Sequence, residues 1–224
     1  MSWTDKCAMK TINDIRFFYN SSTLVETGTF MGVNAEAHRN NFNKIVTIEI
    51  NPEFFEKAKK RLSKYKNIEQ VLGLSSAVLA NRTFDGTPIY YLDAHFYNPK
   101  GPRWVIQKEL EALQGHSKER DCVIIIHDFN NGLGHCTYDG ERLGMNVVGD
   151  LLKKVNSNFH YYTNNMDFVD IMKPGETKDP VIKDNLTYAW KTPRLTYRGI
   201  LYATPTELPK DIKLVKWDGT KSGK

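Results

Sequence analysis

Short apolar runs separated by stretches of helical character limit the folds open to this chain of 224 residues. The clearest runs are residues 89–92 (IYYL) and 123–126 (VIII), which no charged residue interrupts. A strand that is apolar on both faces is typical of a central parallel sheet with helices on each side. We therefore predict strands over residues 23–26, 44–49, 68–72, 88–93 and 122–127.

Helix signals lie between these runs. Asn51 and Pro52 place a capping side chain and a proline at the start of a helix, and apolar residues then recur on one face. The opposite face carries a basic run over residues 57–64. This run could bind RNA, but we favour a solvated helix face, which is the usual role of such runs. A second helix is predicted after Pro102 and a third over residues 145–155.

The pattern changes after residue 155, where turn-rich, charged segments join predicted strands over residues 159–163, 168–172 and 195–202. Such strands suit an antiparallel edge on a parallel sheet. The predicted fold class is α/β: a doubly wound, mostly parallel Rossmann-like sheet with an antiparallel C-terminal edge. We expect a single domain over residues 1–224, made of a helical cap (1–22), a cofactor and metal core (23–155), an antiparallel edge (156–217) and a flexible tail (218–224).

Charge and composition exclude several classes of protein. The 31 Lys and Arg against 26 Asp and Glu give a net charge of +5, far from the dense positive field of a dedicated nucleic-acid binder, so nucleic acid is not an expected partner. No segment approaches the ~20 apolar residues of a membrane-spanning helix, and the first residues lack the apolar core of a signal peptide. We therefore expect a soluble cytoplasmic protein without membrane contacts. The 3 cysteines are too widely spaced for a disulfide framework or a CxxC metal site.

A glycine turn follows the first predicted strand, in residues 24–32 (LVETGTFMG). Gly28 and Gly32 allow a positive φ and a close approach of ligand to main chain, and the helix that follows offers N–H groups to an anionic group. The second strand ends at Glu49. An acid at this position faces the same crevice as the glycine turn and can accept two hydrogen bonds from a ribose diol. Dinucleotide sites use GxGxxG, whereas this pattern is ExGxxxG. Its first acid, Glu26, would repel a pyrophosphate but suits a ligand with an ammonium group.

This pattern resembles the first motif of class I S-adenosylmethionine-dependent methyltransferases. In that family the glycine turn holds the methionine part of the donor, and the acid that ends the second strand holds the ribose. The family often has an acid after the third strand that contacts the adenine amino group. Residues 73–76 read GLSS here, so that contact would come from a serine or the main chain, with Leu74 packing on the ring. The resemblance implies S-adenosylmethionine as cofactor, bound by Glu26, Gly28, Thr29, Gly32, Glu49, Ser75, Ser76 and Asp93.

Acids and histidines end the fourth and fifth predicted strands, as Asp93 and His95 and as His127 and Asp128. Both strand ends open onto the crevice beyond the carboxyl edge of a doubly wound sheet. Methyl transfer to an alcohol needs an activated oxygen. A divalent ion lowers the pKa of an oxygen that it binds, and a placed base adds about 10²–10⁴ in rate. Carboxylates hold a hard ion such as Mg²⁺, and His95 is a residue type that can take the proton.

This arrangement resembles the metal-dependent sugar O-methyltransferases of the macrocin type, in which acids that end the fourth and fifth strands bind Mg²⁺ and a nearby histidine is the base. The resemblance implies Asp93 and Asp128 as metal ligands, with His95 and Asp93 as catalytic residues. His127 departs from the adjacent acid pair of that group. As a direct metal ligand it would favour Mn²⁺ or another first-row ion, and alternatively it orients a carboxylate ligand.

The expected function is therefore the divalent-metal-dependent transfer of a methyl group from S-adenosylmethionine to a hydroxyl of a sugar or glycan. The whole chain also resembles sugar methyltransferases of large algal viruses, which modify rhamnose-containing glycans, so rhamnose is one candidate acceptor. Two alternatives stay open: a small aromatic or RNA acceptor at the same donor site, and a non-catalytic nucleotide- or sugar-binding module. A homo-oligomeric state is also left open.

Overall fold

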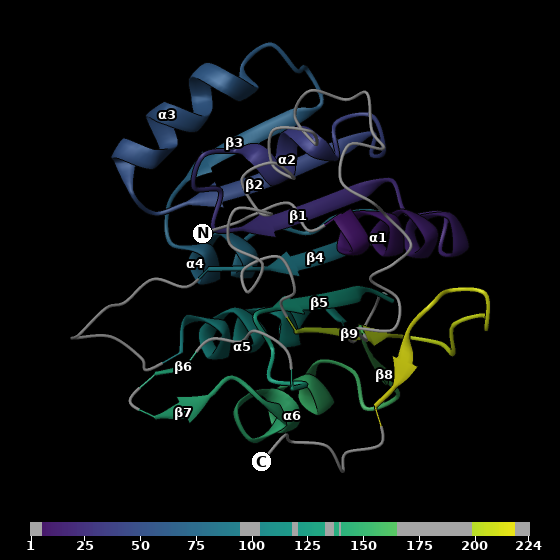
Figure 1. Ribbon diagram of the computed structural model, residues 1–224. Coiled ribbons are helices and arrows are strands. Elements are labelled where there is room, and N and C mark those ends of the chain that lie inside the picture. The colour runs from purple at the N-terminus through teal and green to yellow at the C-terminus, as the bar shows by residue number, and fades with distance from the viewer. Residues whose placement is uncertain are drawn as a thin grey trace.

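The computed structural model describes residues 6–94, 104–117, 121–132, 137–138, 140–164 and 199–217. In this part of the chain, one sheet of 8 strands runs through the molecule in the order β10-β8-β9-β5-β4-β1-β2-β3 (Figure 1). The strands are β1 (Thr23–Thr27), β2 (Lys44–Glu49), β3 (Ile68–Leu72), β4 (Ile89–Leu92), β5 (Val123–His127), β8 (His160–Thr163), β9 (Ile200–Thr204) and β10 (Val215–Lys216). The short strands β6 (Thr137–Tyr138) and β7 (Glu141–Arg142) form a separate hairpin.

The strands β3, β2, β1, β4 and β5 are parallel neighbours, whereas β9 pairs antiparallel with both β5 and β8. The strand β10 pairs antiparallel with β8. The predicted fold class is confirmed. The structure adds that the antiparallel part begins inside the sheet, because β9 inserts between β5 and β8. The predicted strand 168–172, residues 195–198 of the predicted strand 195–202, and the tail 218–224 lie outside the described residues.

The helices are α1 (Lys6–Phe18), α2 (Val33–Ala37), α3 (Pro52–Leu62), α4 (Ser75–Ala80), α5 (Val105–Ser117) and α6 (Met145–Val155). Alternate residues of the central strands enter two hydrophobic cores. Leu24 of β1 and Tyr91 of β4 pack in a core with residues of α1, α2 and α3. Their neighbours Val25 and Leu92 pack in the other core with residues of α4, α5 and α6. Both sheet faces are therefore covered, which is why these strands are apolar along their whole length.

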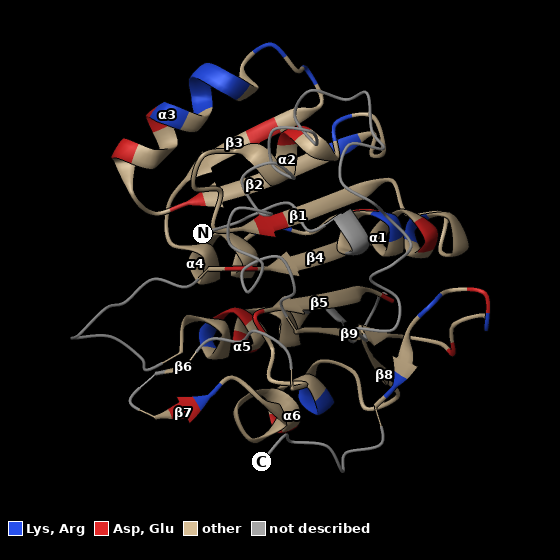
Figure 2. Cartoon of the chain, in the orientation of Figure 1, with Lys and Arg blue, Asp and Glu red and all other residues tan. Residues whose placement is uncertain are grey.

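The helix α3 begins as predicted. The Asn51 side-chain oxygen accepts hydrogen bonds from the N–H groups of Glu53 (2.8 Å) and Phe54 (3.4 Å), and a proline follows the cap. The basic residues of α3 gather along the helix and its end in Figure 2. Lys57 pairs with Glu53 of the preceding turn, in agreement with a solvated helix face. Among the described residues, no helix is both long and apolar enough to cross a bilayer.

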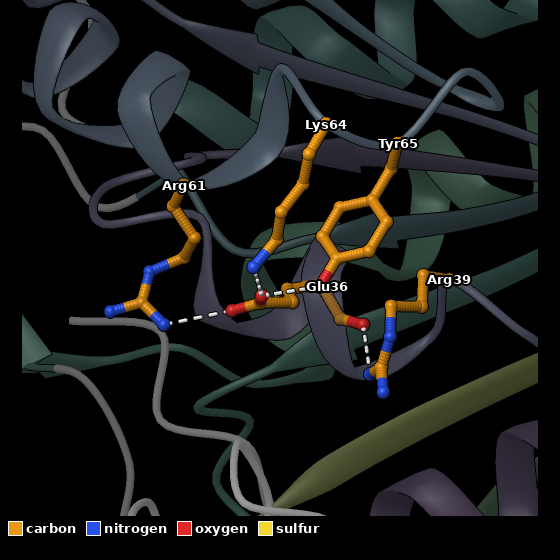
Figure 3. Close-up of polar contacts among 5 residues, drawn as sticks. All are labelled: Glu36, Arg39, Arg61, Lys64 and Tyr65. Carbon is orange, nitrogen blue, oxygen red and sulfur yellow. Dashed lines mark hydrogen bonds and ion pairs between the residues drawn. The ribbon is translucent and has the colours of Figure 1, made fainter.

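A cluster of polar contacts around Glu36 joins α2 to the end of α3 (Figure 3). Its side chain is only 3% exposed and accepts hydrogen bonds from Arg61 Nη1 (2.8 Å) and the Tyr65 hydroxyl (2.7 Å). Lys64 Nζ lies 3.3 Å from the same carboxylate. Burial acts to raise the pKa of Glu36, but the hydrogen bonds and charges of these partners outweigh it and hold that pKa below its usual value. Glu36 is therefore ionised at neutral pH.

Replacing Glu36 with glutamine is expected to lower the free energy of unfolding at pH 7 by about 2 kcal/mol, because a buried acceptor loses its charge beside two cations. Since the pKa of Glu36 is lowered on folding, the stabilisation is present above the ordinary pKa of a glutamate and is lost as pH falls through the folded value. Urea denaturation at pH 7 and at pH 3 measures both effects. The control is Glu53→Gln, which removes an exposed partner of Lys57. Equal losses in the two variants at pH 7 would contradict this role of Glu36.

Candidate active site

The carboxyl ends of β5, β4, β1 and β2 lie side by side, since these strands are parallel neighbours in the sheet. Four of the predicted site residues, Glu26, Glu49, Asp93 and Asp128, lie at or just beyond these ends. All four are buried. The structure therefore brings the predicted donor residues and the predicted metal ligands to one edge of the sheet.

The turn after β1 packs directly against the end of β4. Gly28 has φ 82°, and a Cβ atom at this position would lie 2.7 Å from the carbonyl oxygen of Asp93. Only glycine combines this backbone conformation with so close an approach. Gly32, with φ 72°, has a different role: a Cβ there would lie 2.9 Å from a methyl carbon of Leu62 on α3. The second glycine thus allows the start of α2 to pack on α3.

Several N–H groups of the turn donate within the protein. Those of Gly28 (2.9 Å) and Thr29 (3.2 Å) both donate to the carbonyl oxygen of Ile48. The Phe30 N–H donates to Glu49 Oε2 at 2.8 Å. These three N–H groups precede α2 and attach the turn to β2. The reason is the parallel register, which brings the end of β2 beside the turn.

Glu26 lies beneath the turn, with an exposed fraction of 0%. Asn34 Nδ2 donates to its Oε1 (2.8 Å), and the Thr47 hydroxyl donates to its Oε2 (2.5 Å). The Thr47 hydroxyl also lies 2.6 Å from the hydroxyl of Thr29 in the turn. Burial raises the pKa of Glu26 to about 7, although the two hydrogen bonds act in the opposite direction.

Sequence reasoning missed Thr47 and Asn34. A signal for Thr47 is present, because it is a polar residue inside an apolar strand and alternation places it on the same face as Glu49. Its register position opposite Glu26 could not be read without the strand pairing.

Glu49 ends β2 and accepts hydrogen bonds from the N–H groups of Phe30 and Asn51, both at 2.8 Å. These bonds fix its carboxylate and leave each oxygen a second lone pair for a ribose hydroxyl. Large apolar side chains follow the ends of β2 and β3 and are unusually exposed: Ile50 is 42% exposed and Leu74 is 49% exposed. Exposed apolar groups beside a polar anchor are typical of a site for a flat ring. Ser75 is buried and Ser76 half-buried, at the start of α4 beside this edge.

Asp93, His127 and Asp128 form a buried group in which one possible ligand atom of each residue lies within 4.8 Å of the others. His127 Nδ1 is 3.1 Å from Asp93 Oδ1 and 3.5 Å from Asp128 Oδ1. Asp128 has φ 58°, a strained backbone conformation that aspartate tolerates better than most residues. Two buried carboxylates so close together repel each other unless a cation lies near them. This donor set therefore fits a divalent cation.

The two alternatives for His127 are both compatible with this geometry. Its Nδ1 is close enough to join a set of metal ligands with the two carboxylates, and close enough to orient the Asp93 carboxylate by a hydrogen bond. The predicted base, His95, lies outside the described residues.

No protein-family model matches the sequence, and no curated protein matches it significantly. Solved structures do match. The S-adenosylmethionine-bound amino pentose methyltransferase CalS10 from Micromonospora echinaspora aligns with a TM-score of 0.53 and 13% identity, over 92% of each chain. The plantazolicin methyltransferase BamL, in complex with S-adenosylhomocysteine, aligns with a TM-score of 0.51 and 14% identity, over 92% of this chain and 86% of BamL.

A spermidine synthase in complex with a transition-state analogue aligns with a TM-score of 0.52 and 12% identity, over 93% of this chain and 64% of the synthase. At these identities, the likenesses establish the architecture of the chain, and activity has to be argued from the site itself. The structure has the Rossmann-like fold of the class I S-adenosylmethionine-dependent methyltransferases.

Proposed function

We propose that this protein transfers a methyl group from S-adenosylmethionine to a sugar hydroxyl and that the reaction depends on a divalent cation. The observation that carries the proposal is the contact between the two predicted sites. The glycine turn packs against the Asp93 main chain, and the Asp93 side chain belongs to the group with His127 and Asp128. Donor and acceptor would therefore meet at one place.

Different residues at this edge of the sheet would bind different parts of the donor. Glu49 would accept hydrogen bonds from the ribose hydroxyls, and Ile50 and Leu74 would cover the faces of the adenine ring. Glu26 supplies negative charge beneath the turn, where the ammonium group of the methionine part would lie. This division agrees with the residue types at each strand end, an acid for the diol and exposed apolar side chains for the ring.

Asp93 and Asp128 would hold the cation, with His127 as a further ligand or as the residue that orients Asp93. When bound, the cation supplies a positive charge that lowers the pKa of an acceptor hydroxyl. The protein's own contribution is to hold two carboxylates in a buried site, where their attraction for a cation is stronger than in water. We propose His95 as the group that takes the acceptor proton.

A sugar is the acceptor class that we favour. The support is the likeness of fold to CalS10, which acts on an amino pentose, together with the metal-dependent sugar O-methyltransferases that the strand-end acids resemble. Rhamnose in a glycan is the narrower candidate.

The test is release of S-adenosylhomocysteine with a panel of free sugars and rhamnosides, a catechol and an RNA oligonucleotide, each with Mg²⁺, with Mn²⁺ and with excess EDTA. We expect turnover with a sugar, loss of turnover in EDTA and recovery on adding metal. Full activity in EDTA would overturn the metal dependence. Turnover of the catechol or RNA alone would overturn the sugar, and binding of donor without turnover of any acceptor would favour a binding module.

A further inference from the structure

A chain of buried hydrogen bonds runs from Glu26 to the glycine turn. Asn34 and Thr47 each donate to one oxygen of Glu26, and Thr47 also contacts the hydroxyl of Thr29, which belongs to the turn. All four side chains are buried, with exposed fractions of 3% for Asn34 and 0% for the other three. The network joins β1, β2, the turn and α2 without a group that reaches bulk water.

This inference rests on the proposed donor site. We propose that Thr47 and Asn34 are positioning residues: by donating hydrogen bonds to both oxygens of Glu26, they hold this buried side chain as a carboxylate for the ammonium end of S-adenosylmethionine. Glu26 is covered by its partners, so it acts on the donor through its charge and through the turn.

The network has two arrangements that differ by one proton. When Glu26 is a carboxylate, Thr47 donates to Glu26 and the Thr29 hydroxyl donates to Thr47. When Glu26 is protonated on Oε2, the direction reverses, because Glu26 then donates to Thr47 and Thr47 donates to Thr29. The Asn34 side chain donates in both cases, since its Nδ2 atom can donate hydrogen bonds but cannot accept them. The state of Glu26 is thus transmitted to a residue of the donor turn.

The electrostatics make this proton exchange relevant near neutral pH. Burial raises the pKa of Glu26 to about 7, the hydrogen bonds from Thr47 and Asn34 lower it, and the charges of Asp93 on the β4 side and Glu49 on β2 raise it further. A bound ammonium group favours the carboxylate, so donor binding below pH 7 has to expel a proton. Removing the Thr47 hydroxyl should make that expulsion harder.

The experiment is calorimetric titration of S-adenosylhomocysteine between pH 6 and pH 8.5, in EDTA so that metal does not contribute. For the unchanged protein we expect a Kd that is constant above pH 7 and weakens up to about tenfold per pH unit below it. The titration at pH 6.5 is repeated in buffers of different ionisation enthalpy. The measured binding enthalpy should change with the buffer, which detects the released proton. The pH at which the Kd begins to weaken is called the inflection. Glu26→Gln should bind more weakly with a Kd that no longer depends on pH, which assigns the inflection to Glu26.

Thr47→Val should move the inflection upward by about one pH unit, so that the donor binds about fivefold more weakly at pH 7 and nearly normally at pH 8.5. Thr47→Ser keeps the hydroxyl and should restore the original curve. Asn34→Ala should shift the inflection in the same direction and provides the test if Thr47→Val does not fold. The matched control is Thr204→Val, which removes another buried strand hydroxyl, one that donates to the Thr206 carbonyl.

An unmoved inflection in Thr47→Val and Asn34→Ala, or equal weakening at every pH, would overturn this inference and leave the donor site in place. Failure of the unchanged protein to bind the ligand at any pH would overturn the proposed function, and the inference with it.

Discussion

Replacing Asp128 with asparagine should lower kcat about 10³-fold, while S-adenosylhomocysteine binds with almost unchanged affinity. The variant keeps the size and shape of the side chain but removes one of two negative charges that would hold the cation. Loss of several kcal/mol of stabilisation at the reacting oxygen corresponds to a rate loss of about this size. Asparagine is the appropriate substitute because Asp128 has φ 58°, a conformation that asparagine also adopts readily.

The same variant makes a prediction about stability. A carboxylate oxygen of Asp93 and one of Asp128 lie within 4.8 Å of each other, so in the absence of metal their charges repel each other. Asp128→Asn should therefore not lower the melting temperature of the metal-free protein, and added Mn²⁺ should stabilise the variant far less than the unchanged protein. Asp150→Asn on the exposed side of α6 is the control. Full turnover by Asp128→Asn, measured as S-adenosylhomocysteine release with the acceptor found in the panel, would contradict the role of Asp128.

Replacing Glu49 with glutamine should weaken the binding of S-adenosylhomocysteine about 10- to 100-fold and leave the affinity for Mn²⁺ nearly unchanged. The reason is that hydrogen bonds to a charged acceptor contribute about 1.5–3 kcal/mol each, and Glu49 is the acid placed to accept them from the ribose. The hydrogen bonds that Glu49 accepts from the N–H groups of Phe30 and Asn51 hold its carboxylate in place before the ligand binds.

Because glutamine presents an amide NH₂ where Glu49 has an acceptor oxygen, one of these N–H groups loses its acceptor and the variant also loses some stability. A ligand control separates that effect from ribose binding. A donor product without the 2′ and 3′ hydroxyls should bind more weakly to the unchanged protein, and Glu49→Gln should weaken its binding very little further. If Glu49→Gln weakens the binding of both ligands by the same factor, Glu49 does not contact the diol.

Much of the fold could be predicted because its determinants are local. The unbroken apolar runs at residues 89–92 and 123–126 predict buried parallel strands, and both are central in the sheet. The cap at Asn51 and the proline after it predict the start of α3. The insertion of β9 between β5 and β8 could not be predicted, because it depends on pairing between residues distant in the chain.

For the candidate site, the order of acids along the chain was enough to place Glu49, Asp93 and Asp128 at one edge, since parallel strands end on the same side of a sheet. Gly32 has the predicted positive φ and also a packing role that the sequence did not indicate: its lack of a Cβ makes room for Leu62 of α3, a residue that lies far along the chain. The hydrogen bonds from the turn to Ile48 and Glu49 could not be predicted, because they depend on the register of β1 with β2.

Periodicity, capping and strand-end chemistry are properties of neighbouring residues, so the linear order of amino acids alone indicated a doubly wound sheet with acids gathered at one edge. The hydrogen bonds to Glu26, the raised pKa that follows from its burial, and the close approach of His127 to two aspartates became visible only in three dimensions. Each arises from side chains on different strands whose separation and shielding from water are set by register and packing, which no local pattern encodes.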